Sequence, residues 1–167
     1  VDLRPATDEE LTRAHDPRFI EALGRLRGER GYLDPDTYVS ADSVETARLA
    51  AGSLVAMVDA ILDGPVPKGV ALLRPPGHHA RPAKAMGLCL INNVEVAAAH
   101  ARARGLERVA QMIRGLGVEE AEGSLAERGD IEVVCDLCGK QYRFGAVDAA
   151  QIFRPPGDQL PGTPTVQ

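Results

Sequence analysis

The sequence predicts an α/β fold followed by a small α+β segment built around a hairpin. An uninterrupted apolar run at 70–73 is typical of a parallel strand buried on both faces. An Ala-rich helical stretch at 94–104, ended by Gly105, leads to a second strand-like approach at 106–110. The order strand, helix, strand indicates a β-α-β unit. Further along the chain, two short strand-like runs flank a Cys-x-x-Cys sequence at 135–138.

Helical patterns account for most of the residues before the first predicted strand. Thr7 and Glu10 form a capping box for a short helix, and Asp16, followed by a proline, begins another. Apolar residues then recur at spacings of three and four over 44–62, the clearest amphipathic pattern in the chain. We expect the carboxylate of Asp42 to cap that helix.

Composition excludes several classes of protein. The chain has 167 residues, a net charge of −5 and a pI near 5.4, which argues against a nucleic-acid partner. No apolar run approaches the roughly 18 residues that cross a bilayer, and the first residues lack a signal-peptide pattern. We therefore expect a soluble, cytoplasmic chain with no membrane partner.

The most informative motif places His78 and His79 directly after a Pro-Pro-Gly turn at 75–77. The two prolines fix φ and lack N–H donors, and glycine permits backbone geometry that other residues avoid. If 70–73 is a strand, both imidazoles follow its carboxyl end, where ligands gather in α/β sheets. A fixed histidine pair suits proton transfer near neutral pH. The alternative is an exposed loop that happens to contain two histidines.

The pattern changes after residue 110. Residues 111–117 lack the β-branched density of a central strand, and 118–127 are acidic and helix-prone. The strand-like runs at 131–134 and 141–144 then form a knuckle-like hairpin around Cys135 and Cys138. Four prolines after Arg154 predict a disordered tail. The predicted domains are residues 1–110, 111–153 and the tail 154–167.

Several motifs in the first segment match one family. Besides the Pro-Pro-Gly-His-His motif at 75–79, the chain has Gly-x-Cys-x-x-Asn-Asn at 87–93, with shorter stretches at 4–7, 15–17 and 32–40. Residues 3–110 thereby resemble the N-terminal part of the histone deacetylase and acetylpolyamine amidohydrolase superfamily. The resemblance implies a truncated three-layer α/β/α segment of the arginase/deacetylase type. It also implies zinc-dependent hydrolysis of acetyl-lysine proteins or acetylated small molecules such as acetylpolyamines.

The resemblance assigns roles to four residues. His78 and His79 would be the tandem proton-handling pair, one acting as general base and the other electrostatically. Gly87 and Leu88 would bind substrate along the acyl tunnel, where Leu88 stands in place of the family's usual Phe.

One departure from the family concerns the metal. The family's zinc ligands, an Asp-x-His on the strand after 109–110 and a later Asp, have no counterpart here, nor does its late Tyr. Histidines without the metal cannot activate water as a Lewis acid does. We therefore expect this deacetylase-like hydrolase chain to be inactive alone.

Residues 112–153 resemble a second family. Matching stretches at 116–120, 129–133 and 142–148 surround Cys135 and Cys138 and are similar to the C-terminal redox domain of the 33 kDa heat-shock chaperonin family. The resemblance implies a redox-regulated chaperone that holds zinc with four thiolates and binds unfolded proteins. The upstream Cys-x-Cys is missing, so the zinc site is incomplete, and a reduced, metal-free hairpin is the alternative.

Two further interpretations remain. Cys89 by itself is expected to be a small, buried apolar residue. Because the pattern changes abruptly after Ala110 without a linker, the chain could also be a hybrid of two truncated genes with no evolved activity.

Overall fold

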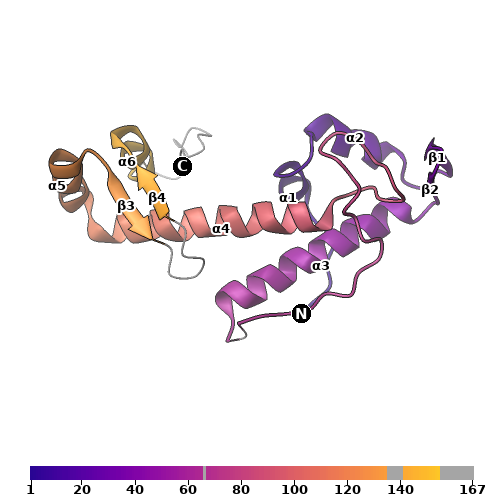
Figure 1. Ribbon diagram of the computed structural model, residues 1–167, viewed down its shortest axis with the longest axis horizontal. Helices are drawn as coiled ribbons and strands as arrows, with labels where there is room; N and C mark the ends of the chain where they lie inside the picture. The colour runs from indigo at the N-terminus through magenta and orange to yellow at the C-terminus, as the bar shows by residue number, and fades with distance from the viewer. Residues whose placement is uncertain (66, 135–140, 155–167) are drawn as a thin grey trace. The chain divides into compact units, whose positions relative to one another are not determined.

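The computed structural model describes residues 1–65, 67–134 and 141–154, and these divide between two compact units, Val1–Arg102 and Ala103–Gln167 (Figure 1). Helix α4 (Asn93–Leu116) begins in the first unit and ends in the second. Each unit has its own hydrophobic core. The two units are therefore described separately.

The first unit is mainly helical. Its elements are α1 (Asp8–Thr12), α2 (Pro17–Arg25), the antiparallel pair β1 (Gly31–Asp34) and β2 (Thr37–Val39), α3 (Ser43–Asp63) and the start of α4. The capping box of Thr7 and Glu10 is confirmed, as is the cap by Asp16. The expected cap by Asp42 is wrong, since its side chain makes no capping bond. The hydroxyl of Ser43 instead accepts the Ser40 N–H at 2.9 Å.

The core of the first unit lies between α1, α2 and α3, with contributions from β2, the segment 85–91 and the first turns of α4. Small side chains on α3 allow the N-terminal segment to pass very close to this helix. A β-carbon at Gly52 would overlap the Arg4 carbonyl oxygen and the Ala6 amide nitrogen. The largest buried apolar members of this core are Leu11, Ile20, Leu23, Val39, Val44, Val55, Leu90, Ile91 and Val96.

The predicted parallel strand at 70–73 is wrong. The segment does not form a strand, and Val70 and Leu72 are 87% and 94% exposed. A strand needs a hydrogen-bonding neighbour, and the predicted partner at 106–110 lies within helix α4. Among the described residues, both paired sheets are antiparallel and two-stranded. The β-α-β unit expected from the sequence therefore does not form.

The predicted helix end at Gly105 is also wrong, because α4 continues to Leu116. A glycine inside a helix costs about 1 kcal/mol relative to alanine, which is too little to end a helix that packs well. Beyond Gly105, α4 contributes Val109 and Ile113 to the core of the second unit, with Leu106 and Ala110 packed against it. The recurrence of these four residues at spacings of three and four explains why the helix persists.

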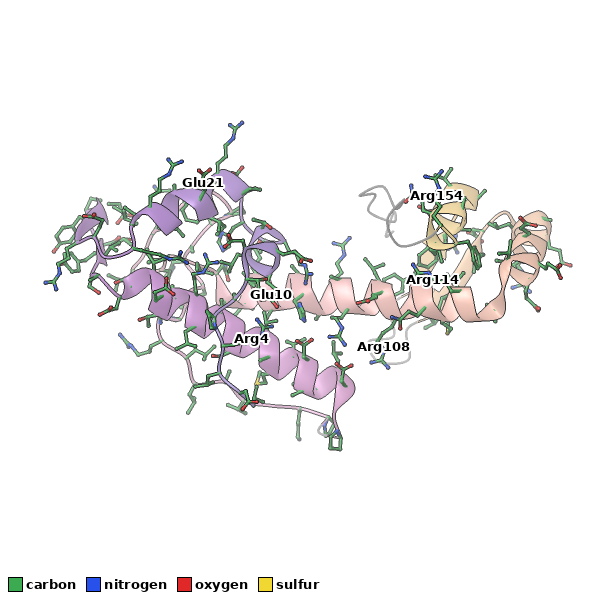
Figure 2. The ribbon with its side chains drawn as sticks, turned by 180° about the vertical axis from the view of Figure 1, so that it is seen from behind. Arg4, Glu10, Glu21, Arg108, Arg114 and Arg154 are labelled. Carbon is green, nitrogen blue, oxygen red and sulfur yellow. The ribbon has the colours of Figure 1, made fainter. Side chains whose placement is uncertain are left out.

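The second unit packs α5 (Val118–Arg128) and α6 (Ala146–Ile152) with the antiparallel strands β3 (Ile131–Val134) and β4 (Gln141–Phe144). Alternate strand residues are buried, so one face of this hairpin joins the core. Arg114 on α4 donates to the Ile152 carbonyl oxygen of α6 at 2.7 Å (Figure 2). The helix predicted at 118–127 and both short strands are confirmed, whereas α6 was not predicted. Cys135, Cys138 and the predicted tail after Arg154 lie outside the described residues.

The close crossing at Gly52 gives a test of the first unit. We expect Gly52→Ala to reduce the free energy of unfolding by about 1–3 kcal/mol, because the added methyl group must displace the backbone at 4–6. Gly24→Ala on α2 is the matched control, since no atom lies within 4 Å of the point that its β-carbon would occupy. It should raise stability by about 0.5–1 kcal/mol. Denaturant unfolding of the two variants would measure the difference, and equal effects would contradict the crossing.

Candidate functional site

The paired histidines lie against one another on an exposed loop. Their Nε2 atoms are 3.1 Å apart, and their ring centroids are 4.2 Å apart with an interplanar angle of 52°. Both side chains are accessible to solvent. Since one nitrogen must donate and the other accept, the two rings hold opposite protonation states at Nε2. The pair predicted from the sequence is therefore a hydrogen-bonded unit.

A buried asparagine fixes the chain before the pair. The amide nitrogen Nδ2 of Asn93, a residue only 1% exposed, donates to the carbonyl oxygens of Pro75 at 2.8 Å and Pro76 at 3.2 Å. Gly77 has a φ of +83°, and a β-carbon there would overlap the Ile91 carbonyl oxygen and lie 2.8 Å from the backbone nitrogen of Asn93. Glycine is thus required both by the left-handed backbone and by the close approach of α4.

Three successive carbonyls fix the chain after the pair. The carbonyl oxygen of Ala80 accepts from Asn92 Nδ2 at 3.1 Å. The oxygens of Arg81 and Pro82 lie 3.1 and 3.2 Å from Nδ1 of His15, and the Asp16 N–H donates to Pro82 at 2.9 Å. The backbone on both sides of the histidine pair is therefore held by side chains from distant parts of the sequence.

Gly87 and Leu88 form a tight turn beside His79. Met86 and Cys89 exchange two backbone hydrogen bonds of 3.0 Å, and the two residues between them have positive φ angles of +60° and +65°. This is the pattern of a two-residue type I′ turn. A β-carbon at Gly87 would lie 2.7 Å from Cβ and Cγ of His79, so glycine leaves room for the imidazole. The Leu88 N–H donates to Thr37 Oγ1 at 3.3 Å, while its side chain is exposed.

The structure places His79 beside the turn at 87–88 and in contact with His78, and no parallel strand presents these residues. The catalytic roles of His78 and His79 and the substrate contacts of Gly87 and Leu88 stay predictions. The positions of His15, Asn92 and Asn93 around the loop were not predicted. Asn92 also caps the start of α4, because its Oδ1 accepts the Glu95 N–H at 3.1 Å. His15, Asn92 and Asn93 all lie in motifs that the sequence analysis singled out. Their partners could not be predicted, because only folding of the loop brings the partner carbonyls near these side chains.

The donor groups on these residues do not form a zinc site. Within the ranges that the structure describes, no three His, Cys, Asp or Glu side chains come together as metal ligands. The Nε2 atoms of His78 and His79 face each other, and Cys89 is fully buried, as expected. The candidate ligands Cys135 and Cys138 lie outside the described residues.

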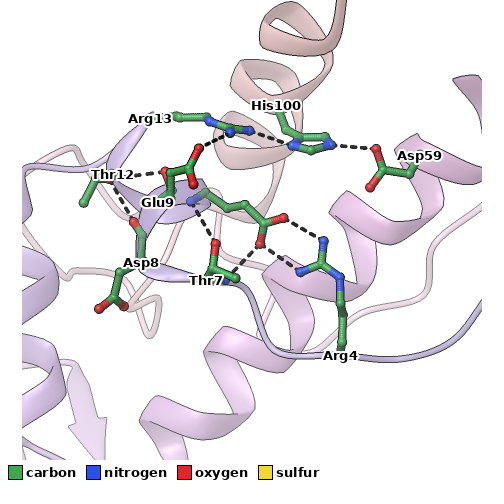
Figure 3. A network of polar contacts seen from close by, with 9 residues as sticks. Arg4, Thr7, Asp8, Glu9, Thr12, Arg13, Asp59 and His100 are labelled. Carbon is green, nitrogen blue, oxygen red and sulfur yellow. Dashed lines mark hydrogen bonds and ion pairs between the residues drawn. The ribbon is translucent and has the colours of Figure 1, made fainter. Parts of the chain in front are cut away.

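A second polar cluster joins α1, α3 and α4 (Figure 3). His100 Nδ1 lies 2.8 Å from Arg13 Nη1, and its Nε2 lies 2.7 Å from Asp59 Oδ1. Nearby, both oxygens of Glu10 accept from the Arg4 guanidinium at 2.6 and 2.9 Å. The contacts of His100 with Arg13 and Asp59 link the end of α1 to α3 and α4.

Comparison with known proteins assigns the first segment. The histone deacetylase domain family matches residues 1–112. The chain belongs to this family. The Hsp33 protein family matches residues 101–145, and the two matches overlap within α4. The resemblance of the two segments to different families is thus confirmed.

Similar proteins are deacetylases that are much longer than this chain. Human polyamine deacetylase HDAC10 is 43% identical over 115 residues, covering 64% of this chain and 17% of that protein. A histone deacetylase-like amidohydrolase from Pseudomonas aeruginosa is 44% identical over 108 residues, covering 64% of this chain and 28% of that protein. The crystal structure of the HDA15 HD domain matches with a TM-score of 0.58 and 41% identity, over 63% of this chain and 30% of that one. The deacetylase-like α/β assignment is supported, and the chain spans less than a third of these relatives. No helix in the described parts is long and apolar enough to cross a membrane.

The Glu10 carboxylate gives a pH-dependent prediction. Hydrogen bonds from Arg4, assisted by the Thr7 N–H, lower the pKa of Glu10 from 4.5 to about 2. The stabilisation is therefore fully present above about pH 4.5 and is lost as the pH falls through 2. Since the Arg4 side chain is 38% exposed, solvent screening limits the contribution to about 1–2 kcal/mol.

We expect Glu10→Gln to lower the free energy of unfolding at pH 7 by about 1–2 kcal/mol. Near pH 2 the variant and the wild type should have nearly the same stability. Glu21→Gln is the matched control, because the Glu21–Arg25 pair lies on an exposed helix face. Chemical denaturation at several pH values measures both variants. A constant difference between wild type and Glu10→Gln across this pH range would contradict the assignment.

Proposed function

We propose that the first 110 residues supply the proton-transfer half of a deacetylase-type site, acting on acetyl-lysine or acetylpolyamine substrates. The observation that carries the proposal is the 3.1 Å contact between His78 Nε2 and His79 Nε2, fixed on both sides by Asn92 and Asn93. An incidental pair of surface histidines would not need buried amide groups to hold its flanking carbonyls. Membership of the histone deacetylase family supports the choice of reaction.

In this proposal the pair moves one proton through amide hydrolysis. One imidazole takes a proton from the attacking water as its oxygen bonds to the acetyl carbon. The second imidazole stabilises the resulting positive charge by accepting a hydrogen bond at Nε2. When the carbon–nitrogen bond breaks, the same proton passes to the leaving amine. The turn at Gly87 and Leu88 would line the adjacent acyl tunnel, with Leu88 exposed toward substrate.

We also propose that the chain is inactive alone, because a histidine pair without zinc accelerates amide hydrolysis too little. General acid–base catalysis contributes about 10²- to 10⁴-fold, which is far below the acceleration needed for amide hydrolysis. Zinc supplies Lewis-acid activation in the deacetylase family, and the described residues do not assemble ligands for it. Turnover would therefore require metal-binding residues from outside this chain.

An amidase assay tests this proposal. Purified chain with zinc should release no acetate above the buffer rate from an acetyl-lysine peptide or from acetylspermidine. A version extended by the metal-binding part of a related deacetylase should gain activity, and His79→Ala in that version should lower kcat by about 10²-fold or more. His100→Gln is the matched control, because His100 lies outside the pair. Zinc-dependent turnover by the chain alone would contradict its inactivity, and an unaffected His79→Ala variant would contradict the role of the pair.

A second candidate function concerns the other unit. The Hsp33 match at 101–145 and the antiparallel pairing of β3 with β4 favour a redox-responsive chaperone segment that binds unfolded proteins. Cys135 and Cys138 occupy the connection between these strands. Two thiolates suit zinc, but four are needed to close a structural site, so any bound metal would exchange readily.

A thiol-sensitive zinc titration tests the second candidate. Reduced chain should take up zinc, release it on oxidation, and lose uptake in the Cys135→Ser variant. Cys89→Ala should leave uptake unchanged, because Cys89 is buried in the core of the first unit. Uptake of far less than one zinc per chain by the reduced wild type would remove the basis for this function.

A further inference from the structure

His15 is a buried histidine outside the proposed catalytic pair. It is only 3% exposed, and its ring lies 5.6 Å from that of Phe19, centroid to centroid. Its Nε2 accepts the backbone N–H of Asn92 at 3.0 Å. Its Nδ1 faces the carbonyl oxygens of Arg81 and Pro82 at 3.1 and 3.2 Å.

These partners fix the protonation of the ring. A backbone N–H can only donate, so Nε2 must be unprotonated. Carbonyl oxygens can only accept, so Nδ1 must carry the hydrogen. His15 is therefore a neutral imidazole in the Nδ1–H tautomer, with both ring nitrogens occupied by the backbone.

The two backbone segments that His15 joins are those that hold the paired histidines. Arg81 and Pro82 follow His79 by two and three residues. Asn92, at the other nitrogen, uses its side chain to hold the carbonyl of Ala80. The Asp16 N–H adds a bond to Pro82, so the start of α2 contributes two successive residues to this contact. One buried ring thus sets the separation between the loop after His79 and the residue that precedes α4.

We propose that His15 is a positioning residue for the His78–His79 pair, acting through its Nδ1–H tautomer and without contact with substrate. The catalytic role of the His78–His79 pair rests on the proposed function, but the effect of His15 on the geometry of the pair does not. The Nδ1–H bonds reach the carbonyls of the second and third residues after His79, and they are the more important half of the contact. The Nε2 bond to Asn92 anchors the ring.

Imidazole ¹⁵N NMR of the full chain, at about pH 8 where imidazoles are neutral, tests this role. Wild type should show His15 protonated at Nδ1 and one protonated and one unprotonated Nε2 in the His78–His79 pair. His100 is an internal reference for folding, since the Arg13 guanidinium donates to Nδ1 and Nε2 donates to Asp59. Its tautomer is therefore the opposite of that of His15.

Three variants separate the two halves of the contact. His15→Ala should convert the pair to the averaged tautomers of solvent-exposed imidazoles while the His100 signals stay unchanged. His15→Asn places an amide N–H where Nδ1 stood and should restore the pair's signature. His15→Gln places an acceptor near the Nε2 position and should not restore it.

An unchanged pair signature in a folded His15→Ala variant would overturn the proposal. Equal pair signatures in the His15→Asn and His15→Gln variants would also overturn it. This comparison tests the proposal even when the His15→Ala variant does not fold. Because the readout is a ring signal, absence of amidase activity does not affect it, and a failed positioning role leaves the amidase result intact.

Discussion

The irregular loop from 74 to 92 depends on one constraint, which is that backbone carbonyls outside a sheet still need donors. Among the residues that the structure describes, no strand pairs with this part of the chain, so side chains supply the hydrogen bonds that a neighbouring strand would have supplied. Asn93 holds the carbonyls before the histidine pair, while Asn92 and His15 hold those after it. The contact between His78 and His79 follows from this arrangement, because a backbone held on both sides restricts the orientations that the two adjacent imidazoles can adopt.

Helix α4 connects this loop to the rest of the chain in two ways. Its first residue, Asn93, fixes the loop together with Asn92 just before the helix, and its last turns provide apolar residues to the core of the second unit. The overlap of the two family matches, at residues 101–112, lies within this helix. A helix tolerates such an overlap because its hydrogen bonds are local, whereas a strand at the same position would need a neighbour at each edge. A continuous helix, α4, therefore occupies 106–110, where the sequence predicted a strand and where the two family matches overlap.

The exposed apolar segment at 70–73 has no strand partner among the described residues of the first unit. Its apolar side chains Val70 and Leu72 are exposed, although the sequence is typical of a strand buried on both faces. A β-carbon at Gly69 would contact the Met57 sulfur on α3, so one side of the chain is covered near its start. The HDA15 domain, which this chain resembles, is matched over 30% of its length.

Local signals in the sequence determined much of this protein. The capping box at Thr7 and Glu10, the helix at 44–62 and the strands around the Cys-x-x-Cys sequence were all predicted, since each depends on residues near in sequence. Tertiary structure alone decided that 70–73 forms no strand and that α4 continues through Gly105, because a strand needs a partner and a helix gains from distant packing. It also decided the role of His15, whose two ring nitrogens find backbone partners 66 to 77 residues away. No local pattern encodes such a contact, because its partners meet only when the loop has folded.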